Sequence, residues 1–148
     1  MNAPHPAGPA GRDEALRLRK PTIMLKGVDR ERLEVIALSA LLQNPRVAGL
    51  LLDEVDRAEV LPDDAPAPGR VGLGSWVRYR DMDGGETRSV RIVEAARPDR
   101  ELELGVLSPL GVALIGLAAG QSIIASDRRG TEWLVQVLSV TRAYDAAP

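Results

Sequence analysis

The chain has 148 residues, the length of one ordinary domain or two small ones, and its hydrophobic fraction of 45% is typical of a globular protein. It has no cysteine, which excludes disulfides, thiolate nucleophiles and cysteine-bound zinc or iron–sulfur clusters. Its one histidine, His5, lies in a start rich in Pro, Gly and Ala, so residues 1–20 are expected to be a disordered tail. Histidine-dependent catalysis and histidine-bound metals are therefore not expected.

Charge is distributed unevenly along the chain. The formal net charge is −2, which argues against general nucleic-acid binding, because counterion release requires a basic face. Residues 29–64 carry nine acidic against four basic side chains, so a partner that touches this segment is expected to be basic. No basic start precedes a long apolar run, and no stretch approaches the roughly 20 apolar residues of a membrane span. The protein is therefore expected to be cytoplasmic, with no membrane partner.

The first predicted helix follows a short β-prone run at residues 22–25. Asp29 is expected to cap this helix with its carboxylate. One apolar stripe at helical spacing is formed by Leu33, Ile36, Ala37, Ala40 and Leu41. Pro45 is expected to end the helix, because proline disfavours helical geometry at the residue before it.

A second helix is predicted from about residue 48 to residue 60. Its apolar side carries Leu51, Leu52, Val55 and Ala58, and its polar side carries Asp53, Asp56, Arg57 and Glu59. Two amphipathic helices joined by a short turn predict an antiparallel hairpin over residues 21–61. Residues 62–69 contain three prolines and a glycine and are expected to be a semi-extended linker.

A β-rich segment follows the linker. Alternation predicts strands over residues 75–80, 86–93, 101–106, 121–125 and 131–140, with turns at 81–85 and 127–130. Ser108 is expected to cap a short helix over residues 110–117, with Pro109 at the first helical position, where a missing amide costs nothing. Strands around one short helix predict a small α+β domain over residues 70–142.

The C-terminal part resembles a known domain. Residues 71–77, 81–86 and above all 108–121, which begin Ser-Pro-Leu-Gly, resemble the C-terminal domain of the transcript-cleavage Gre factors. That domain has an FKBP-like fold, so the resemblance implies the same fold here.

The N-terminal part narrows the resemblance. Residues 21–23, 29–33 and 54–58 resemble the Rnk proteins, known as regulators of nucleoside diphosphate kinase. These proteins carry a Gre-like C-terminal domain behind a short helical hairpin. The resemblance therefore implies an α+β protein with a short, coiled-coil-like antiparallel hairpin followed by an FKBP-like domain.

A partner-binding site is implied at the start of the short helix. Ser108 and Pro109 match the residues whose loop meets RNA polymerase in Gre factors, and Leu107 and Leu110 flank them. The residues alone indicate a helix cap, worth about 1 kcal/mol of stability, and a cap can also be a contact because a helix start is rigid and exposed. Leu107 departs from the Gre pattern, which has a polar residue there. It marks either a different partner surface or a strand end turned inward.

Acidic residues are the candidates for metal-assisted chemistry, because Gre factors place magnesium with acidic residues at a hairpin tip. The tip here, residues 42–47, contains no carboxylate. The candidates Asp53, Glu54, Asp56 and Glu59 lie along the second helix, where a solvated face is the ordinary explanation. No metal, cofactor or transcript cleavage is therefore expected.

Other activities are weighed against ordinary structural roles. Prolyl isomerases cradle proline among several aromatic rings, whereas this chain has only Trp76, Tyr79, Trp133 and Tyr144, and both tryptophans are expected in the core or on a strand face. The glycines at turns lack the strand–loop–helix context of a phosphate-binding loop, so no nucleotide site is predicted.

Arginines alternate on two neighbouring predicted strands and recur in the last turn. They are Arg78, Arg80, Arg88, Arg91, Arg128 and Arg129. A solvated sheet face is expected, and contact with acidic residues of a polymerase is the alternative.

The leading functional hypothesis is a non-enzymatic regulator of transcription elongation. It would bind RNA polymerase near the secondary channel and compete with Gre-type factors without cleaving transcripts, so nucleic-acid contact would be indirect. The alternative is a regulator that binds a metabolic enzyme such as nucleoside diphosphate kinase, although the family name equally describes an indirect effect. The sequence leaves open how the hairpin packs on the C-terminal domain.

Overall fold

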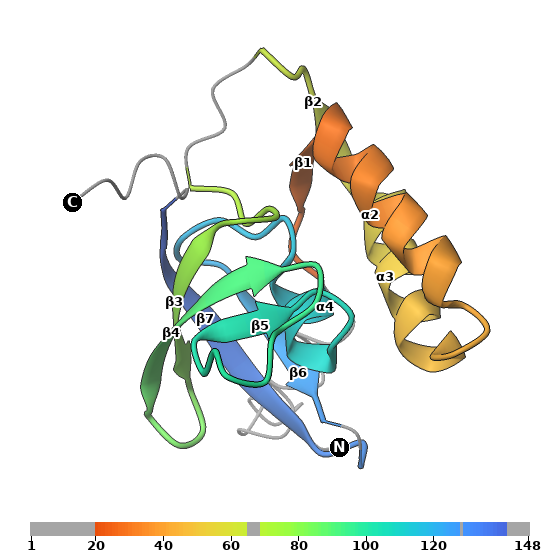
Figure 1. The fold of residues 1–148 in the computed structure, drawn as a ribbon. Coiled ribbons are helices and arrows are strands. Elements are labelled where there is room, and N and C mark those ends of the chain that lie inside the picture. The colour runs from red at the N-terminus through yellow and green to blue at the C-terminus, as the bar shows by residue number, and fades with distance from the viewer. Residues whose placement is uncertain (1–19, 65–68, 128, 142–148) are drawn as a thin grey trace, which may run out of the picture.

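The structure, a computed structural model, describes residues 20–64, 69–127 and 129–141. The expected tail therefore lies outside the described residues apart from Lys20, and so do residues 65–68 of the expected linker. Figure 1 shows a helical hairpin beside a curled sheet that partly surrounds a short helix. The predicted α+β class is confirmed.

The hairpin consists of β1 (Met24–Lys26), α2 (Gly27–Ala40), α3 (Pro45–Arg57) and β2 (Glu59–Leu61). α2 buries Leu33, Ala37 and Ala40, and α3 buries Val47, Ala48, Leu51, Glu54 and Val55. These residues include much of the predicted apolar stripes, so the helical hairpin is confirmed. α3 is amphipathic as predicted, whereas α2 also carries exposed apolar residues, among them Val35 and Leu38.

Both helices begin earlier than predicted. α2 starts directly after Lys26, its N-cap residue, which offers no side-chain cap, so the prediction that Asp29 is the cap was wrong. A carboxylate from the expected linker meets this helix start instead: the backbone N of Val28 donates to Asp63 Oδ1 at 2.9 Å. α3 starts at Pro45 itself, because proline fits the first helical position.

The end of α3 also differs from the prediction. Residues 59–61 form β2 and not a last helical turn, since Ala58 already has an extended backbone (φ −67°, ψ 138°). β2 pairs in parallel with β1, with Leu25 opposite Val60. The backbone N of Glu59 donates to Ile23 O at 2.9 Å. Because the partner strand lies at the other end of the hairpin sequence, no local signal marks β2.

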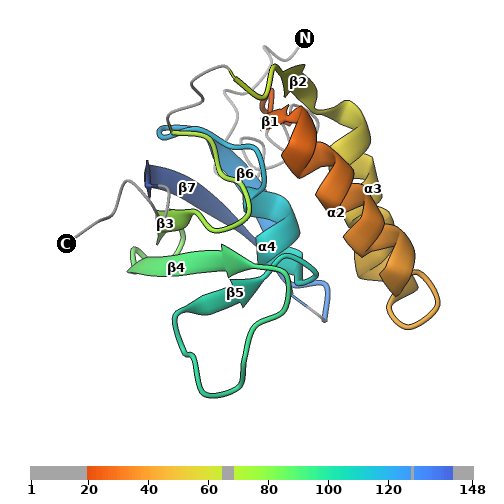
Figure 2. The same ribbon diagram turned by 45° about the horizontal axis from the view of Figure 1, so that its top comes forward.

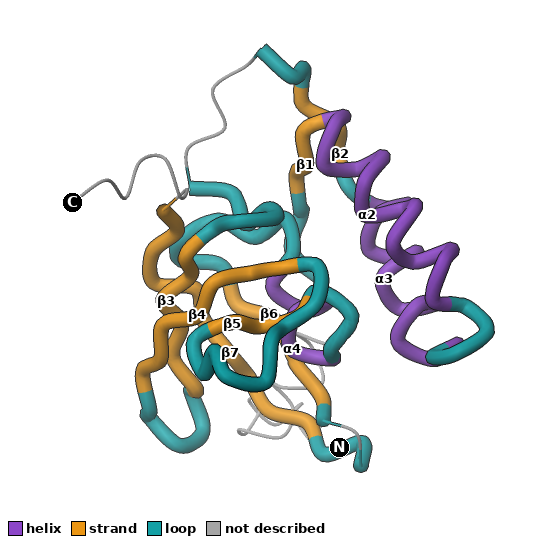
Figure 3. The backbone as a smooth tube through the Cα atoms, in the orientation of Figure 1, coloured by secondary structure: helices purple, strands orange, loops and turns teal. Residues whose placement is uncertain are grey.

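The C-terminal half is a five-stranded sheet in the order β5-β4-β3-β7-β6. Its elements are β3 (Trp76–Asp81), β4 (Thr87–Val93), β5 (Glu103–Gly105), α4 (Pro109–Leu114), β6 (Ser122–Ser126) and β7 (Glu132–Thr141). Neighbouring strands are antiparallel except β4 and β5, which are parallel. All five predicted strands are present. The colours of Figure 3 distinguish this strand-rich half from the helical hairpin.

α4 ends three residues before the predicted boundary. Gly116 has a φ of 77°, which side chains rarely adopt, so the helix cannot continue through it. A Cβ on Gly116 would lie 2.7 Å from the Cβ of Ile23. Glycine is therefore required both for the backbone turn and for the close approach of Ile23, the residue directly before β1.

The hairpin and the sheet half share one hydrophobic core. Ile23 is completely buried, and the backbone N of Met24 donates to Gly116 O at 3.1 Å. Gln121 Nε2 and Arg70 Nη1 donate to Thr22 O at 3.1 and 3.3 Å. α3 also packs against α4, and Figure 2 shows α4 between the sheet and the hairpin. The orientation of the hairpin is thus fixed by the segment before α2 and by α3.

One acidic residue of α3 is buried, against expectation. Glu54 is only 3% exposed, whereas the other three acidic candidates are exposed. Its carboxylate lies 2.9 Å from Lys20 Nζ and 2.7 Å from Arg57 Nη2. Arg57 Nη1 also donates to Pro21 O at 2.6 Å. Glu54 therefore ties the chain before β1 to α3 and does not belong to a solvated face.

Candidate functional site

Ser108 joins β5 to α4 and caps the helix as predicted. Its Oγ accepts from Gly111 N at 3.1 Å and donates to Gly105 O at 2.6 Å. The backbone N of Val112 donates to the Ser108 carbonyl at 2.9 Å. Pro109 occupies the first helical position, as predicted. These bonds hold the start of α4 in one geometry.

Gly111 completes this turn, and sequence analysis missed its steric role. A Cβ on Gly111 would overlap with Gly105 O and lie 3.0 Å from Ser108 Oγ. α4 passes so close to the end of β5 that only glycine fits there. The Ser-Pro-Leu-Gly block therefore has a structural explanation at Ser108, Pro109 and Gly111, and any partner contact is an additional role.

A hollow of about 270 Å³ joins the start of α4 to the tip of the hairpin. Its lining, which we call the tip junction, consists of Asn44, Arg46, Val47, Leu107, Ser108 and Pro109. The last three are half-buried, so each offers only part of its surface. The structure thus brings three of the four predicted partner-binding residues together with residues of α3.

The fourth predicted residue, Leu110, lines a different hollow of about 230 Å³. The other side chains there are Tyr79, Asp81, Glu86, Arg88 and Trp133. Tyr79 is 6% exposed, and burial raises the pKa of its hydroxyl. Trp76 does not line this hollow, and Tyr144 lies outside the described residues. The hollow combines two aromatic rings with three charged groups.

Leu107 also lines a second groove of about 360 Å³, between α2 and the end of β4. Val35, Ile36 and Ala40 form part of its apolar wall. Arg32 and Glu94 line the same groove and form an ion pair, with Arg32 Nη2 donating to Glu94 Oε2 at 2.8 Å. The hydrogen bond from Arg32 lowers the pKa of Glu94. Leu107 therefore lies between two hollows, each of which has one wall from the hairpin.

An exposed apolar stripe runs along α2 and past its end. Val35 is 52% exposed, Leu38 is 51% exposed, and Leu42 is 98% exposed. Sequence analysis identified only the buried stripe, although the spacing of three and four residues between these side chains is a signal that could have revealed a second one. Exposed apolar residues that gather near a tip are typical of interaction surfaces.

The exposed acidic residues do not gather into a metal site. Among residues 20–64, 69–127 and 129–141, no group of three or more His, Cys, Asp or Glu is placed to hold a metal ion. Asp53 and Asp56 share a hollow with Arg30, whose Nε donates to Val55 O at 3.2 Å. Nor does any described helix have the length and apolar character needed to cross a membrane.

The predicted arginine face requires one correction. Arg78 pairs with Ser89 and Arg91 pairs with Trp76 across β3 and β4, so Arg78 and Arg91 share a face of the sheet. Arg88 pairs with Tyr79 and therefore lies on the opposite face. The face that carries Arg78 also carries Arg80, whereas Arg128 lies outside the described residues.

Comparison with known proteins finds relatives of both halves. Residues 21–61 match the family described as Rnk N-terminus, and residues 65–142 match the family Transcription elongation factor, GreA/GreB, C-term. A protein of Escherichia coli strain K12 named Regulator of nucleoside diphosphate kinase is 32% identical over 136 residues, which cover 88% of this chain and 96% of that protein. Transcription elongation factor GreA of Leuconostoc mesenteroides is 27% identical over 93 residues, which cover 62% of this chain and 58% of that protein.

A solved structure from Nitrosomonas europaea has a similar fold. It is titled prokaryotic transcription elongation factor GreA/GreB, and its TM-score is 0.63 at 29% identity. The match covers 81% of this chain and 99% of that one, so it includes residues of both the hairpin and the sheet half.

Proposed function

The chain belongs to the Rnk family and carries a GreA/GreB C-terminal domain, and on this premise we propose that it binds RNA polymerase near the secondary channel. In this proposal the protein is a non-enzymatic regulator of transcription elongation, which competes with Gre-type factors and does not cleave transcripts. The observation that carries the proposal is the tip junction, where the hairpin and the Gre-like domain offer one continuous surface.

The chemistry of this surface suits a protein partner. Leu107 and Pro109 offer partly exposed apolar area, Leu42 in the turn of the hairpin is almost fully exposed, and Asn44 and Arg46 are exposed polar residues of the tip junction. An apolar centre with a polar rim is the usual arrangement of a protein interface. Because the hairpin is already fixed on the sheet half, binding would not have to order the two parts relative to each other, which reduces its entropic cost.

The absence of transcript cleavage follows from the length and charge of the hairpin. α2 has 14 residues, which corresponds to about 21 Å at 1.5 Å per residue. No carboxylate lies at the tip, and the exposed Asp53 and Asp56 are about two and three turns after Pro45, the first residue of α3. A hairpin of this kind can occupy the mouth of a channel and exclude a longer factor, but it lacks acidic residues at its end to position a metal ion.

We also infer that the curled five-stranded sheet around α4 is FKBP-like, as the Gre-type relatives suggest. Isomerase activity is not part of the proposal. The hollow beside Leu110 contains Asp81, Glu86 and Arg88, whereas a proline ring would need an apolar, aromatic cradle.

The affinity for core RNA polymerase tests this function. Leu107→Gln removes apolar surface at the tip junction, and Leu138→Gln is the matched control, because Leu138 is a 38% exposed leucine on β7 that lines neither hollow at the tip. We expect Leu107→Gln to weaken binding about tenfold and Leu138→Gln to leave it unchanged. A Gre factor should displace the wild-type protein.

Three results would contradict the proposal. The first is the absence of binding at micromolar polymerase, and the second is an equal loss in both variants after each is shown to be folded. The third is magnesium-dependent transcript cleavage that disappears on Asp53→Ala or Asp56→Ala.

The name of the Escherichia coli relative favours a second candidate, a direct complex with nucleoside diphosphate kinase. The exposed carboxylates of Asp53, Asp56 and Glu59 would attract a basic partner surface. Co-purification separates the candidates, since recovery of polymerase subunits supports the first and recovery of the kinase supports the second. Charge reversal of Asp53 and Asp56 to Lys should remove the kinase but not polymerase held at the tip junction.

A further inference from the structure

A cavity separate from the tip junction lies on the face of the sheet that is turned away from the core. Trp76 on β3 pairs with Arg91 on β4, and Arg91 pairs with Glu103 on β5, so the three side chains share one face. Val77 and Tyr79, which alternate with Trp76 along β3, are buried on the other face. Trp76, Arg91 and Glu103 therefore form a row across the outer face.

The loop of residues 94–102 completes the cavity, which has a volume of about 420 Å³. Arg97, Arg100 and Leu102 belong to its lining. The backbone N of Arg91 donates to Leu102 O at 2.7 Å, which holds the end of the loop against β4. Within the loop, the backbone N of Arg100 donates to Arg97 O at 3.0 Å. Pockets of about 300–1,000 Å³ are the usual size for small-molecule ligands.

Glu103 forms an ion pair with Arg97. Its carboxylate accepts from Arg97 Nη2 at 2.9 Å, from Arg97 Nε at 3.2 Å and from the backbone N of Arg97 at 3.1 Å. These hydrogen bonds lower the pKa of Glu103 to about 2, so the pair stays charged throughout the neutral range. The pairing of Glu103 with Arg97 thus fixes the wall of the cavity, whereas Arg100 interacts with Glu103 through its charge and without a hydrogen bond.

Arg91 and Arg100 have no ion-pair partner within the part of the chain that the structure describes. Arg91 Nε is moreover buried without a hydrogen-bond acceptor. A buried donor without an acceptor is costly and usually has a functional or solvent-mediated explanation.

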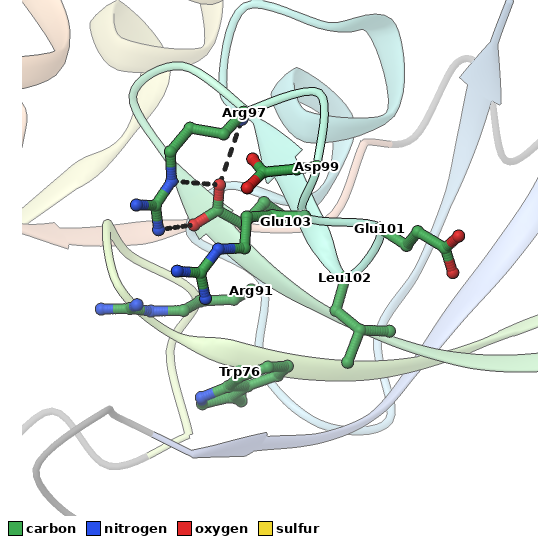
Figure 4. A pocket seen from close by; sticks show the side chains of 8 residues that line it. Trp76, Arg91, Arg97, Asp99, Glu101, Leu102 and Glu103 are labelled. Atoms are coloured by element: carbon green, nitrogen blue, oxygen red, sulfur yellow. Dashed lines mark hydrogen bonds and ion pairs between the residues drawn. The ribbon is translucent and has the colours of Figure 1, made fainter.

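The remaining carboxylates of the lining do not take the place of that acceptor. In Figure 4 the side chain of Glu101 extends away from Trp76 and Arg91, and Asp99 lies beside the Arg97–Glu103 pair. Figure 4 also shows Arg91 above the indole of Trp76, and both side chains line the cavity. A flat aromatic surface and two guanidinium groups without a close ion-pair partner therefore border the same space.

We propose that this cavity binds a small ligand that combines a flat aromatic ring with a phosphate or similarly charged group, as a nucleoside diphosphate does. The ring lies against the indole of Trp76, because nucleobases stack on aromatic side chains. The anionic group accepts from Arg91 and Arg100, because guanidinium groups match the geometry of phosphate oxygens. Arg97 and Glu103 are positioning residues that hold the loop. This proposal is independent of polymerase binding.

The test is isothermal titration calorimetry on the full chain without polymerase. The probes are a nucleoside diphosphate, inorganic pyrophosphate, which has the anion without the ring, and the parent nucleoside, which has the ring without the anion. We expect the diphosphate to bind at least about tenfold more tightly than either fragment, since each group contributes to the contact.

Variants assign the binding to the cavity. We expect the affinity for the diphosphate to fall about tenfold in each of three variants, which are Arg91→Gln, Arg100→Gln and Trp76→Leu. Arg78→Gln is the matched control, because Arg78 is an exposed arginine of the same sheet face that does not line the cavity. Circular dichroism verifies that each variant is folded, and Arg100→Gln, on an exposed loop, keeps the test decisive if a strand variant unfolds.

Three outcomes of these titrations would overturn the proposal. They are the absence of saturable binding below about 1 mM, pyrophosphate bound as tightly as the diphosphate, and an equal loss in Arg78→Gln and Arg100→Gln. A short single-stranded RNA that binds about tenfold more tightly than the mononucleotide would also overturn it, because it would indicate a nucleic-acid surface in place of a small-ligand site.

Discussion

The two ends of the helical hairpin use their side chains in different ways. At the base, Ile23 is completely buried, Glu54 is paired with two cations, and Asp63 accepts from an amide of the first turn of α2. At the tip, Leu42 is 98% exposed and Asn44 makes no side-chain cap for α3. An exposed leucine and an uncapped helix start do nothing for the stability of the fold. The base therefore holds the hairpin on the sheet half, and the tip is available to a partner.

This difference predicts that substitutions at the two ends have separate effects. Changes at the base should lower the free energy of unfolding, and changes at the tip should lower affinity for a partner while stability stays the same. Effects at sites that share no contacts are usually additive, so double variants across the two ends can test the separation.

The largest effect on stability is expected for Ile23→Ala. The side chain is completely buried between the hairpin and Gly116, and its removal leaves a cavity where the two halves meet. We expect a loss of about 3 kcal/mol in the free energy of unfolding, measured by urea denaturation. Val60→Ala is the control, since Val60 is 53% exposed on β2, and it should cost less than about 0.5 kcal/mol. A similar small loss in both variants would mean that the base does not hold the halves together.

A smaller loss is expected for Glu54→Gln. The substitution removes the charge that compensates Arg57 and Lys20 inside the base. Removing one partner of a buried pair costs several kcal/mol, and partial exposure of Lys20 reduces this to about 2 kcal/mol. Asp53→Asn, an exposed neighbour on the same helix, is the control and should leave the denaturation midpoint unchanged. An unchanged midpoint for Glu54→Gln as well would contradict the structural role of this carboxylate.

The correct predictions concern features that depend on contacts between residues close together in the sequence. Ser108 caps α4 through the backbone N of Gly111, only three residues away. The predicted turn after β3 forms because Asp81 Oδ1 accepts from the backbone N of Asp83 and of Gly84, at 2.9 and 3.0 Å. Local hydrogen bonds of this kind can be inferred from residue type and spacing alone.

Several incorrect predictions have a different cause, which is a partner far away in the sequence. Asp63 reaches α2 from the expected linker, so Asp29 is not the cap. Glu54 is buried beside Arg57, a pairing that their spacing of three residues allows, and beside Lys20, which lies 34 residues away and which no helical periodicity reveals. Similarly, the resemblance to Gre factors pointed to Leu107, Ser108 and Pro109, but only tertiary packing places Asn44 and Arg46 beside them and directs Leu110 to another hollow.

Midway between base and tip, the Arg32–Glu94 pair should give a pH-dependent effect smaller than either substitution at the base. The hydrogen bond from Arg32 holds the pKa of Glu94 below its ordinary value of 4.5. The pair therefore contributes stability above about pH 4.5, and this contribution is lost as the pH falls through the lower folded-state pKa of Glu94. The melting temperatures of wild type and Glu94→Gln should differ slightly at pH 7 and converge at low pH. Because both side chains are exposed, added salt should also reduce the difference. A difference that grows on acidification would contradict this assignment.

The smallest effect on stability, and the sharpest test of the comparison, is expected for Leu42→Ser. Leu42 is 98% exposed, so the substitution should change the free energy of unfolding by less than about 0.5 kcal/mol. Affinity for RNA polymerase should nevertheless fall about tenfold if this leucine becomes buried in the complex. Val28→Ser is the matched control, because Val28 is a 56% exposed apolar residue in the first turn of α2, at the end of this helix that is far from Leu42. An equal loss of affinity in both variants would show that the whole exposed side of α2 meets the partner. A loss confined to Leu42→Ser would indicate that the hairpin contacts the polymerase by its tip.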